Sequence, residues 1–175
     1  MKKLLLTMAL VTSLVSAQEA DKKQDAKKPE QKSEMKDHDM HSMPGHKVST
    51  AKSLQWVPGP ASLPPGAQMA VLEGDPKQPG QFTIRLKLPA GFKIKPHTHP
   101  AIEHVTVLSG EAHFGMGEKW DETKGMKLSA GDFIYMHPGQ VHFAWITAET
   151  LVQVHGIGPW KVNYVNPADA PTAKK

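Results

Sequence analysis

The sequence contains no cysteine among its 175 residues. Disulfide bonds, thiolate metal ligands and cysteine nucleophiles are therefore excluded, and any metal ion must be held by histidine and carboxylate side chains. Arginine is almost absent too, since Arg85 is the only arginine among the 21 basic residues. Because arginine side chains and basic clusters carry most contacts to nucleic acids, we expect no nucleic-acid partner. The length suits one domain.

Aromatic side chains are missing from residues 18–53, and all of them lie between Trp56 and Tyr164. Residues 18–53 consist mainly of Lys, Glu, Asp, Gln and Ser, so they have too little apolar surface to offset the conformational entropy lost on ordering. We therefore predict a disordered arm over residues 18–53, a folded domain over residues 54–167 and a disordered tail over residues 168–175.

The apolar run at residues 4–15 is too short to cross a membrane, because a transmembrane helix needs about 20 residues. A basic start precedes the run and small residues follow it at positions 15–17, which is typical of a secretory signal peptide over residues 1–17. We expect cleavage before Gln18 and a periplasmic or secreted protein with no stable membrane insertion. An uncleaved N-terminal anchor is the alternative.

Histidine and methionine gather at residues 35–46, which read MKDHDMHSMPGH. Imidazole and thioether together suit soft or borderline ions such as copper. One interpretation is a weak accessory site for copper, zinc or nickel. The other is a solvated tether that binds ions loosely, because ordering a flexible chain around an ion costs conformational entropy. The histidines concerned are His38, His41 and His46.

From residue 54 onward the chain consists of short β-type runs separated by proline and glycine. The runs recur about every ten residues, which is the spacing of an all-β sandwich or barrel. No window has a long helical period, although residues 118–125 have room for one helical turn. The predicted strands are 68–73, 81–88, 102–108, 111–115, 133–136, 141–147, 151–155 and 161–165.

Candidate metal ligands lie in the segment 91–110, GFKIKPHTHPAIEHVTVLSG. His97 and His99 are two residues apart, so on an extended segment their Cα atoms are about 7 Å apart and both side chains can share one ion. Glu103 keeps the even spacing and joins them if the segment stays extended. A fourth candidate, His142, follows a predicted strand and a Pro-Gly turn.

The segment 91–110 matches the first motif of the cupin superfamily at every position. That motif is glycine, five residues, histidine, one residue, histidine, three residues, glutamate, six residues and glycine. The chain therefore resembles a cupin over about residues 54–165. The matching residues are Gly91, His97, His99, Glu103 and Gly110.

A second segment, GDFIYMHPGQVH, resembles most of the second cupin motif through Gly131, Gly139 and His142. Two positions differ, since His137 stands where the motif has proline and Ile146 where it has asparagine. The chain's ending, from Val152 onward, also resembles that of small bacterial cupins, some of them related to the cupin half of anti-sigma factors.

The resemblance implies an all-β double-stranded β-helix, a jelly-roll or cupin barrel, with one divalent metal ion inside. Iron or manganese is favoured, and zinc, nickel or copper stays open. Because cupins commonly pair through sheet edges, the resemblance also implies a homodimer. The implied metal ligands are His97, His99, Glu103 and His142.

Alternation along the strands predicts an apolar wall beside the metal. If Glu103 and His142 point inward, the residues two positions further along each strand point inward too. An apolar wall beside an open coordination position suits oxygen chemistry or a small organic ligand. The predicted pocket residues are Val105, Val107, Phe114, Tyr135 and Ala144.

His155 is the candidate catalytic residue for proton transfer, because it lies on a late predicted strand and histidine titrates near neutral pH. The alternative is a histidine that is hydrogen-bonded within the barrel or orients a ligand.

Three functions fit this pattern. The first is a metal-dependent oxidoreductase, a dioxygenase or oxidase that acts on a small organic molecule, because three imidazoles and one carboxylate leave open positions on an octahedral ion. The second is a non-catalytic module that binds or senses a metal or a small molecule. The third is an isomerase or lyase that uses the metal as a Lewis acid. The fold alone does not decide among them.

Overall fold

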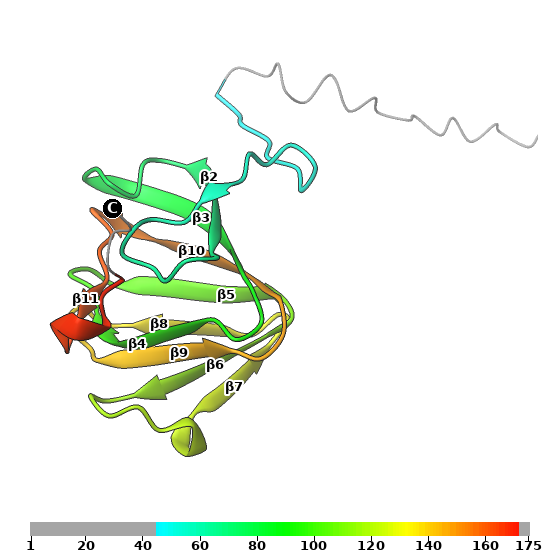
Figure 1. Ribbon diagram of the computed structural model, residues 1–175. Helices are drawn as coiled ribbons and strands as arrows, with labels where there is room; N and C mark the ends of the chain where they lie inside the picture. Colours follow the sequence, from blue (N-terminus) through cyan, green and yellow to red (C-terminus); the bar gives the residue numbers. More distant parts are fainter. Residues whose placement is uncertain (1–44, 172–175) are drawn as a thin grey trace, which may run out of the picture. The chain divides into compact units, whose positions relative to one another are not determined.

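The computed structural model of the protein describes residues 45–171. Within these residues, eleven strands form two antiparallel sheets, and in Figure 1 strands β3, β10 and β5 lie above β4, β9 and β6. The first sheet has the order β1 (Val57–Pro58), β2 (Gln68–Glu73), β3 (Gly80–Leu88), β10 (Thr150–Gly158), β5 (Glu103–Ser109) and β8 (Phe133–Met136). The second sheet has the order β11 (Asn163–Tyr164), β4 (Lys93–Thr98), β9 (His142–Ile146), β6 (Glu111–Met116) and β7 (Met126–Ser129).

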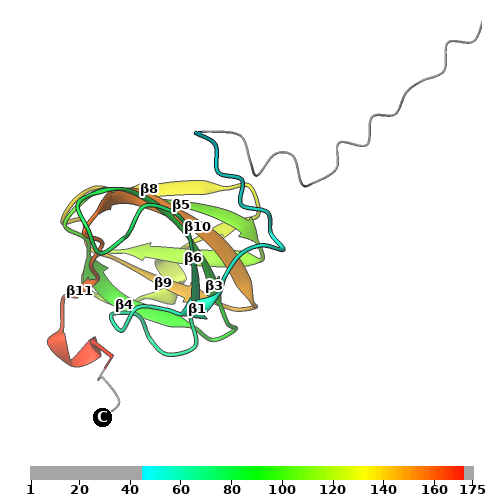
Figure 2. The same ribbon diagram turned by 90° about the horizontal axis from the view of Figure 1, so that it is seen from above.

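Successive strands alternate between the two sheets from β3 to β6 and again from β8 to β11. This winding is that of a jelly-roll, or double-stranded β-helix, so the all-β prediction is confirmed. Two short 3₁₀ helices join the strands, namely η2 (Glu122–Lys124) and η3 (Pro167–Asp169). The segment that carries η3 lies beside β4 and β11 in Figures 1 and 2, where Val165 donates its N–H to the Pro96 carbonyl at 2.9 Å.

The core lies between the inner faces of the two sheets, because apolar and polar residues alternate along the long strands. Ile84, Val154 and Val105 stand directly opposite one another on β3, β10 and β5, and all three are buried. Complete burial of a side chain of this size stabilises the fold by about 1.5–3 kcal/mol. We therefore expect apolar packing to hold the barrel together independently of any ion.

The predicted strands correspond to β2, β3, β5, β6, β8, β9, β10 and β11, and their ends differ by at most three residues. The predicted helical turn at residues 118–125 contains η2. The sequence prediction omits β1, β4 and β7. In β4 the lysines and Pro96 give little local strand preference, and the pairing with β9, far away in the sequence, makes the segment extended.

Some predictions concern residues outside the described range. The signal peptide at residues 1–17, most of the arm including His38 and His41, and residues 172–175 lie outside it. His46 lies inside it and is exposed, and Thr50 and Ser53 form a hydrogen-bonded turn near the end of the arm. Among residues 45–171, no helix has the length and apolarity needed to span a bilayer.

Candidate metal centre

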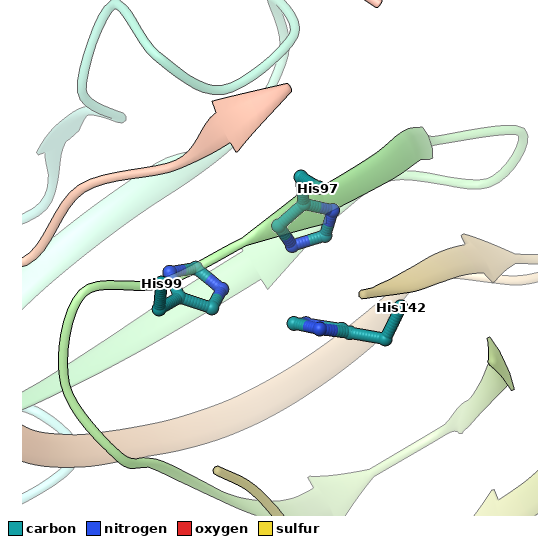
Figure 3. Close-up of side chains that lie close together, drawn as sticks. All are labelled: His97, His99 and His142. Carbon is teal, nitrogen blue, oxygen red and sulfur yellow. The ribbon is translucent and has the colours of Figure 1, made fainter. Parts of the chain in front are cut away.

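Three histidines converge inside the barrel (Figure 3). His97 lies near the end of β4, His99 follows that strand, and His142 begins β9. The pairing of β4 with β9 places His97 directly opposite His142. The three side chains are 2, 3 and 1 % exposed, and each offers a ring nitrogen within 4.8 Å of the other two. Three imidazoles this close are able to share one metal ion.

Backbone carbonyls fix the orientation of all three rings. The Nδ1 of His97 lies 2.7 Å from the Lys95 oxygen, and the Nδ1 of His142 lies 3.1 Å from the Gln140 oxygen. The Nδ1 of His99 lies 2.7 Å from the carbonyl oxygen of residue 161. Because a carbonyl oxygen can only accept, each Nδ1 carries the hydrogen and donates it. In the neutral ring this arrangement leaves Nε2 unprotonated with its lone pair available, which is the form that binds metals.

The Nε2 of His99 is buried and has no hydrogen-bond partner. A buried polar atom without a partner costs about 1–3 kcal/mol, so such atoms are rare in folded proteins. A metal ion between the rings would satisfy this lone pair, and the donor set of buried imidazoles is one that divalent transition metals prefer. The residues present therefore fit a divalent metal ion.

Glu103 reaches the same region from the opposite sheet. The chain turns between Thr98 and Glu103, so the segment from His97 to Glu103 does not stay extended. Glu103 instead begins β5, is 5 % exposed and points inward. Its Oε2 lies 3.4 Å from the Nε2 of His99 and 3.8 Å from the Nε2 of His142. The carboxylate thus lies beside two of the three imidazoles.

The turn before His142 is tied to His99. Gly139 has a φ of +73°, a left-handed conformation that glycine adopts without strain. Its N–H donates to the His99 carbonyl at 2.9 Å. The glycine of the second motif therefore makes the turn although His137 replaces the usual proline.

Burial sets the electrostatics of the centre. Desolvation, together with the neighbouring His142 and His99, lowers the pKa of His97 to about 3, and desolvation lowers the pKa of His99 to about 4. Desolvation also lowers the pKa of His142 and raises the pKa of Glu103. The imidazoles are therefore neutral at physiological pH and ready to bind a cation. A cation placed among them would in turn favour the charged carboxylate.

An apolar cavity of about 40 Å³ adjoins the centre, with Glu103 and His142 at its polar end. A single buried water needs only about 10–15 Å³ of such volume, so the cavity has room for a few non-hydrogen atoms. Three of the predicted pocket residues, Val105, Phe114 and Ala144, line it. Val107 is fully buried in the core but is not part of the lining.

Tyr135 does not line the cavity, so its prediction as a pocket residue is wrong. It is 49 % exposed and stands directly opposite His104 in the pairing of β8 with β5. Because Glu103 and its partner Met136 face inward, the adjacent pair of His104 and Tyr135 faces outward. The strand was identified correctly, but its inner face was not.

His155 is also on the outer face. It lies between inward-facing Val154 and Gly156 on β10, and it stacks on His104 with ring centroids 4.6 Å apart and planes 5° apart. Desolvation and the nearby His104 lower its pKa. The wall of the barrel separates His155 from the three histidines, so a role in proton transfer at the metal centre is not supported.

Two aromatic residues at the centre were not identified from the sequence. Trp160 donates its Nε1–H to the Oε1 of Glu103 at 2.8 Å. Tyr164, on β11, stands directly opposite His97 and donates its hydroxyl to the Ser62 carbonyl at 3.0 Å. Both residues follow the last long strand, and the one local signal is the presence of two aromatic side chains after it.

The jelly-roll fold with three histidines inside the barrel is the arrangement that the sequence resemblance to cupins implies. A family model described as the ChrR cupin-like domain matches residues 44–161. The chain therefore belongs to the ChrR cupin-like family. A comparison with curated proteins finds no match.

Solved structures with the same fold include several cupins. The polyketide cyclase RemF from Streptomyces resistomycificus aligns with a TM-score of 0.58 and 15 % identity, over 72 % of this chain and 89 % of that one. A putative acetylacetone dioxygenase from Methylibium petroleiphilum aligns with a TM-score of 0.55 and 19 % identity, over 75 % and 89 %. An acetylacetone dioxygenase from Acinetobacter johnsonii aligns with a TM-score of 0.54 and 18 % identity, over 76 % and 85 %. At these identities the similarity establishes the fold alone.

Proposed function

We propose that the chain binds one divalent metal ion between His97, His99 and His142, with Glu103 as the fourth ligand. We further propose that it is a metal-dependent oxidoreductase, a dioxygenase or oxidase, acting on a small organic molecule. The observation that carries the proposal is the set of three buried histidines whose ring nitrogens lie within 4.8 Å of one another, together with the buried Nε2 of His99, which has no hydrogen-bond partner. Three imidazoles and one carboxylate suit iron or manganese and leave one or two coordination positions open.

The residues of the chain have distinct parts in this function. The backbone carbonyls behind the rings keep each Nε2 free for the metal. The apolar side chains of Val105, Phe114 and Ala144 keep bulk water from the cavity beside the open positions. When bound, the metal would supply a Lewis-acidic and redox-active centre at the polar end of this cavity.

The structural neighbours support an oxygenase as the first activity to test. Two of them are named as acetylacetone dioxygenases, one of these as putative. A small β-diketone is therefore the first substrate class to assay, followed by phenols and thiols.

Elemental analysis and an oxygen electrode together test the proposal. Protein purified without a histidine tag should contain about one equivalent of iron or manganese, and the iron-loaded form should consume dioxygen with at least one substrate class. Zinc or nickel in place of iron or manganese would count against the oxidoreductase. Protein that takes up none of these metals would overturn the metal site itself.

A second candidate is a non-catalytic module that binds or senses a metal or a small molecule. The small volume of the cavity favours it, because about 40 Å³ holds only a few non-hydrogen atoms. Tight binding of one metal equivalent with no oxygen uptake on any substrate would support this candidate over the enzyme. Lewis-acid chemistry of the isomerase or lyase type uses the same ligands, and one structural neighbour is named as a cyclase.

We also infer that residues 1–17 direct export and are then removed. The basic start, the apolar run and the small residues at positions 15–17 support this inference. N-terminal sequencing of protein from the native host should begin at Gln18, and intact Met1 would contradict the inference. Light scattering of the same preparation tests the expected homodimer.

A further inference from the structure

Trp160 contacts two members of the metal centre from outside the strands. It lies between β10 and β11, and its Nε1–H donates to the Oε1 of Glu103 at 2.8 Å. Its ring also stacks on His99, with centroids 5.7 Å apart and planes 9° apart. No other described tryptophan approaches a residue of the centre in this way.

The hydrogen bond from Trp160 gives the two carboxylate oxygens of Glu103 different partners. Oε1 of Glu103 is occupied by the indole, and Oε2 faces the Nε2 atoms of His99 and His142 at 3.4 and 3.8 Å. An indole nitrogen can only donate, so Oε1 must accept this hydrogen bond. The bond opposes rotation of the Glu103 side chain away from the centre. Glu103 therefore presents one oxygen to the histidines.

The same short segment also holds His99. The Trp160 ring covers one face of the imidazole, and the carbonyl of the next residue, Lys161, accepts the hydrogen of His99 Nδ1. Residues 160 and 161 thus orient a ligand candidate from each sheet, Glu103 at the start of β5 and His99 after β4. The two candidates are associated with strands of different sheets, and this segment contacts both of them.

We propose that Trp160 is a positioning residue that makes Glu103 a one-oxygen metal ligand and fixes the ring of His99. This inference rests on the proposed metal site. Partners that orient metal ligands typically change metal affinity by about 10–100-fold when they are removed.

Trp160→Phe tests the inference, since it keeps an aromatic ring for His99 and removes the N–H donor. Trp120→Phe is a matched control, because Trp120 also donates to a carboxylate, Glu122, at 3.1 Å but on the outer face. Metal affinity is measured for Co²⁺ and Zn²⁺ by competition with a chelator. We expect about 10–100-fold weaker binding in Trp160→Phe, still with one equivalent at saturation, and a shifted visible absorption band of bound Co²⁺. We expect less than twofold change in Trp120→Phe.

A double-mutant cycle separates positioning from general stability. In a Glu103→Ala background, Trp160→Phe should weaken binding much less than it does in the parent, because the hydrogen bond is already absent. An equal loss in both backgrounds, or unchanged affinity in Trp160→Phe, overturns the inference while the metal site stands. Absence of metal binding in the parent protein overturns the proposed function instead.

The parent protein provides a measurement that needs no variant. Addition of Zn²⁺ should leave the indole N–H of Trp160 protected from hydrogen exchange in NMR spectra, since Glu103 Oε1 still accepts it. Faster exchange of this proton on metal binding would mean that both oxygens of Glu103 turn to the metal, and would overturn the inference.

Discussion

His97 and His142 stand directly opposite each other in the pairing of β4 with β9, with their ring centroids 4.2 Å apart. Neither ring can leave this position without breaking the hydrogen bond of its Nδ1 to a backbone carbonyl. The sheet therefore preorganises two of the three imidazoles before any ion arrives, and the turn through Gly139 ties the third, His99, to the same strands.

Removal of a single imidazole should abolish metal binding without unfolding the barrel. We expect His97→Ala and His142→Ala to retain less than a tenth of the bound metal, because each removes a ligand rather than a residue that orients one. Elemental analysis measures the metal, and circular dichroism checks the fold. His155→Ala is the matched control, because His155 is on the outer face and should keep a full equivalent. Normal metal content in both ligand variants would contradict the site.

The metal-free protein should lose stability on acidification below about pH 6.5. The folded-state pKa is about 3 for His97 and about 4 for His99, whereas an unfolded histidine titrates near 6.5. The unfolded state therefore binds more protons between these values, and the free energy of unfolding falls as the pH falls. The pKa of His142 is also lowered, so this histidine adds to the loss of stability. The pKa of Glu103 is raised, so this one group opposes the loss.

Urea denaturation of chelator-treated protein between pH 8 and pH 4 measures this dependence. The midpoint should be constant above about pH 7 and fall steadily below it. A His99→Gln variant should show a weaker dependence, because one of the lowered groups is gone. A midpoint that stays constant down to pH 4 would show that the histidines are not held neutral by burial.

Metal should stabilise the protein by binding the folded state alone. At a free metal concentration of 100 times Kd, the expected gain is about 2.7 kcal/mol, so Tm should rise on loading and return on treatment with a chelator. Scanning calorimetry measures the shift. His142→Ala should show no shift, and an equal shift in that variant would mean that the stabilising ion binds elsewhere.

Filling the cavity should lower oxygen uptake without removing the metal ion. Ala144 lines the cavity on β9, two residues after His142. Ala144→Leu should keep one metal equivalent and lower oxygen uptake at least tenfold, with a cost in stability of about 1–3 kcal/mol from overpacking. Val71→Leu, at an exposed position of β2, is the control for a neutral increase in volume. Unchanged uptake in Ala144→Leu would mean that the substrate binds outside this cavity.

The sequence predicted the positions of the strands better than it predicted which face of each strand is buried. Runs of alternating apolar residues were enough to locate β3, β5 and β10. Alternation says that two faces differ but not which one meets the core in a short strand of mixed character. In β8 the aromatic Tyr135 looks like a core residue, yet the burial of Met136 turns it outward.

The sequence by itself determined the types of ligand available and the two-residue spacing that lets His97 and His99 share one ion. It also determined the all-β architecture, because local alternation and turn residues depend on neighbours along the chain. Only the tertiary structure decided that Glu103 arrives from the opposite sheet, that Trp160 holds one of its oxygens, and that His155 faces away. These are consequences of pairing between strands far apart in sequence, and no local pattern encodes which partner a strand will meet.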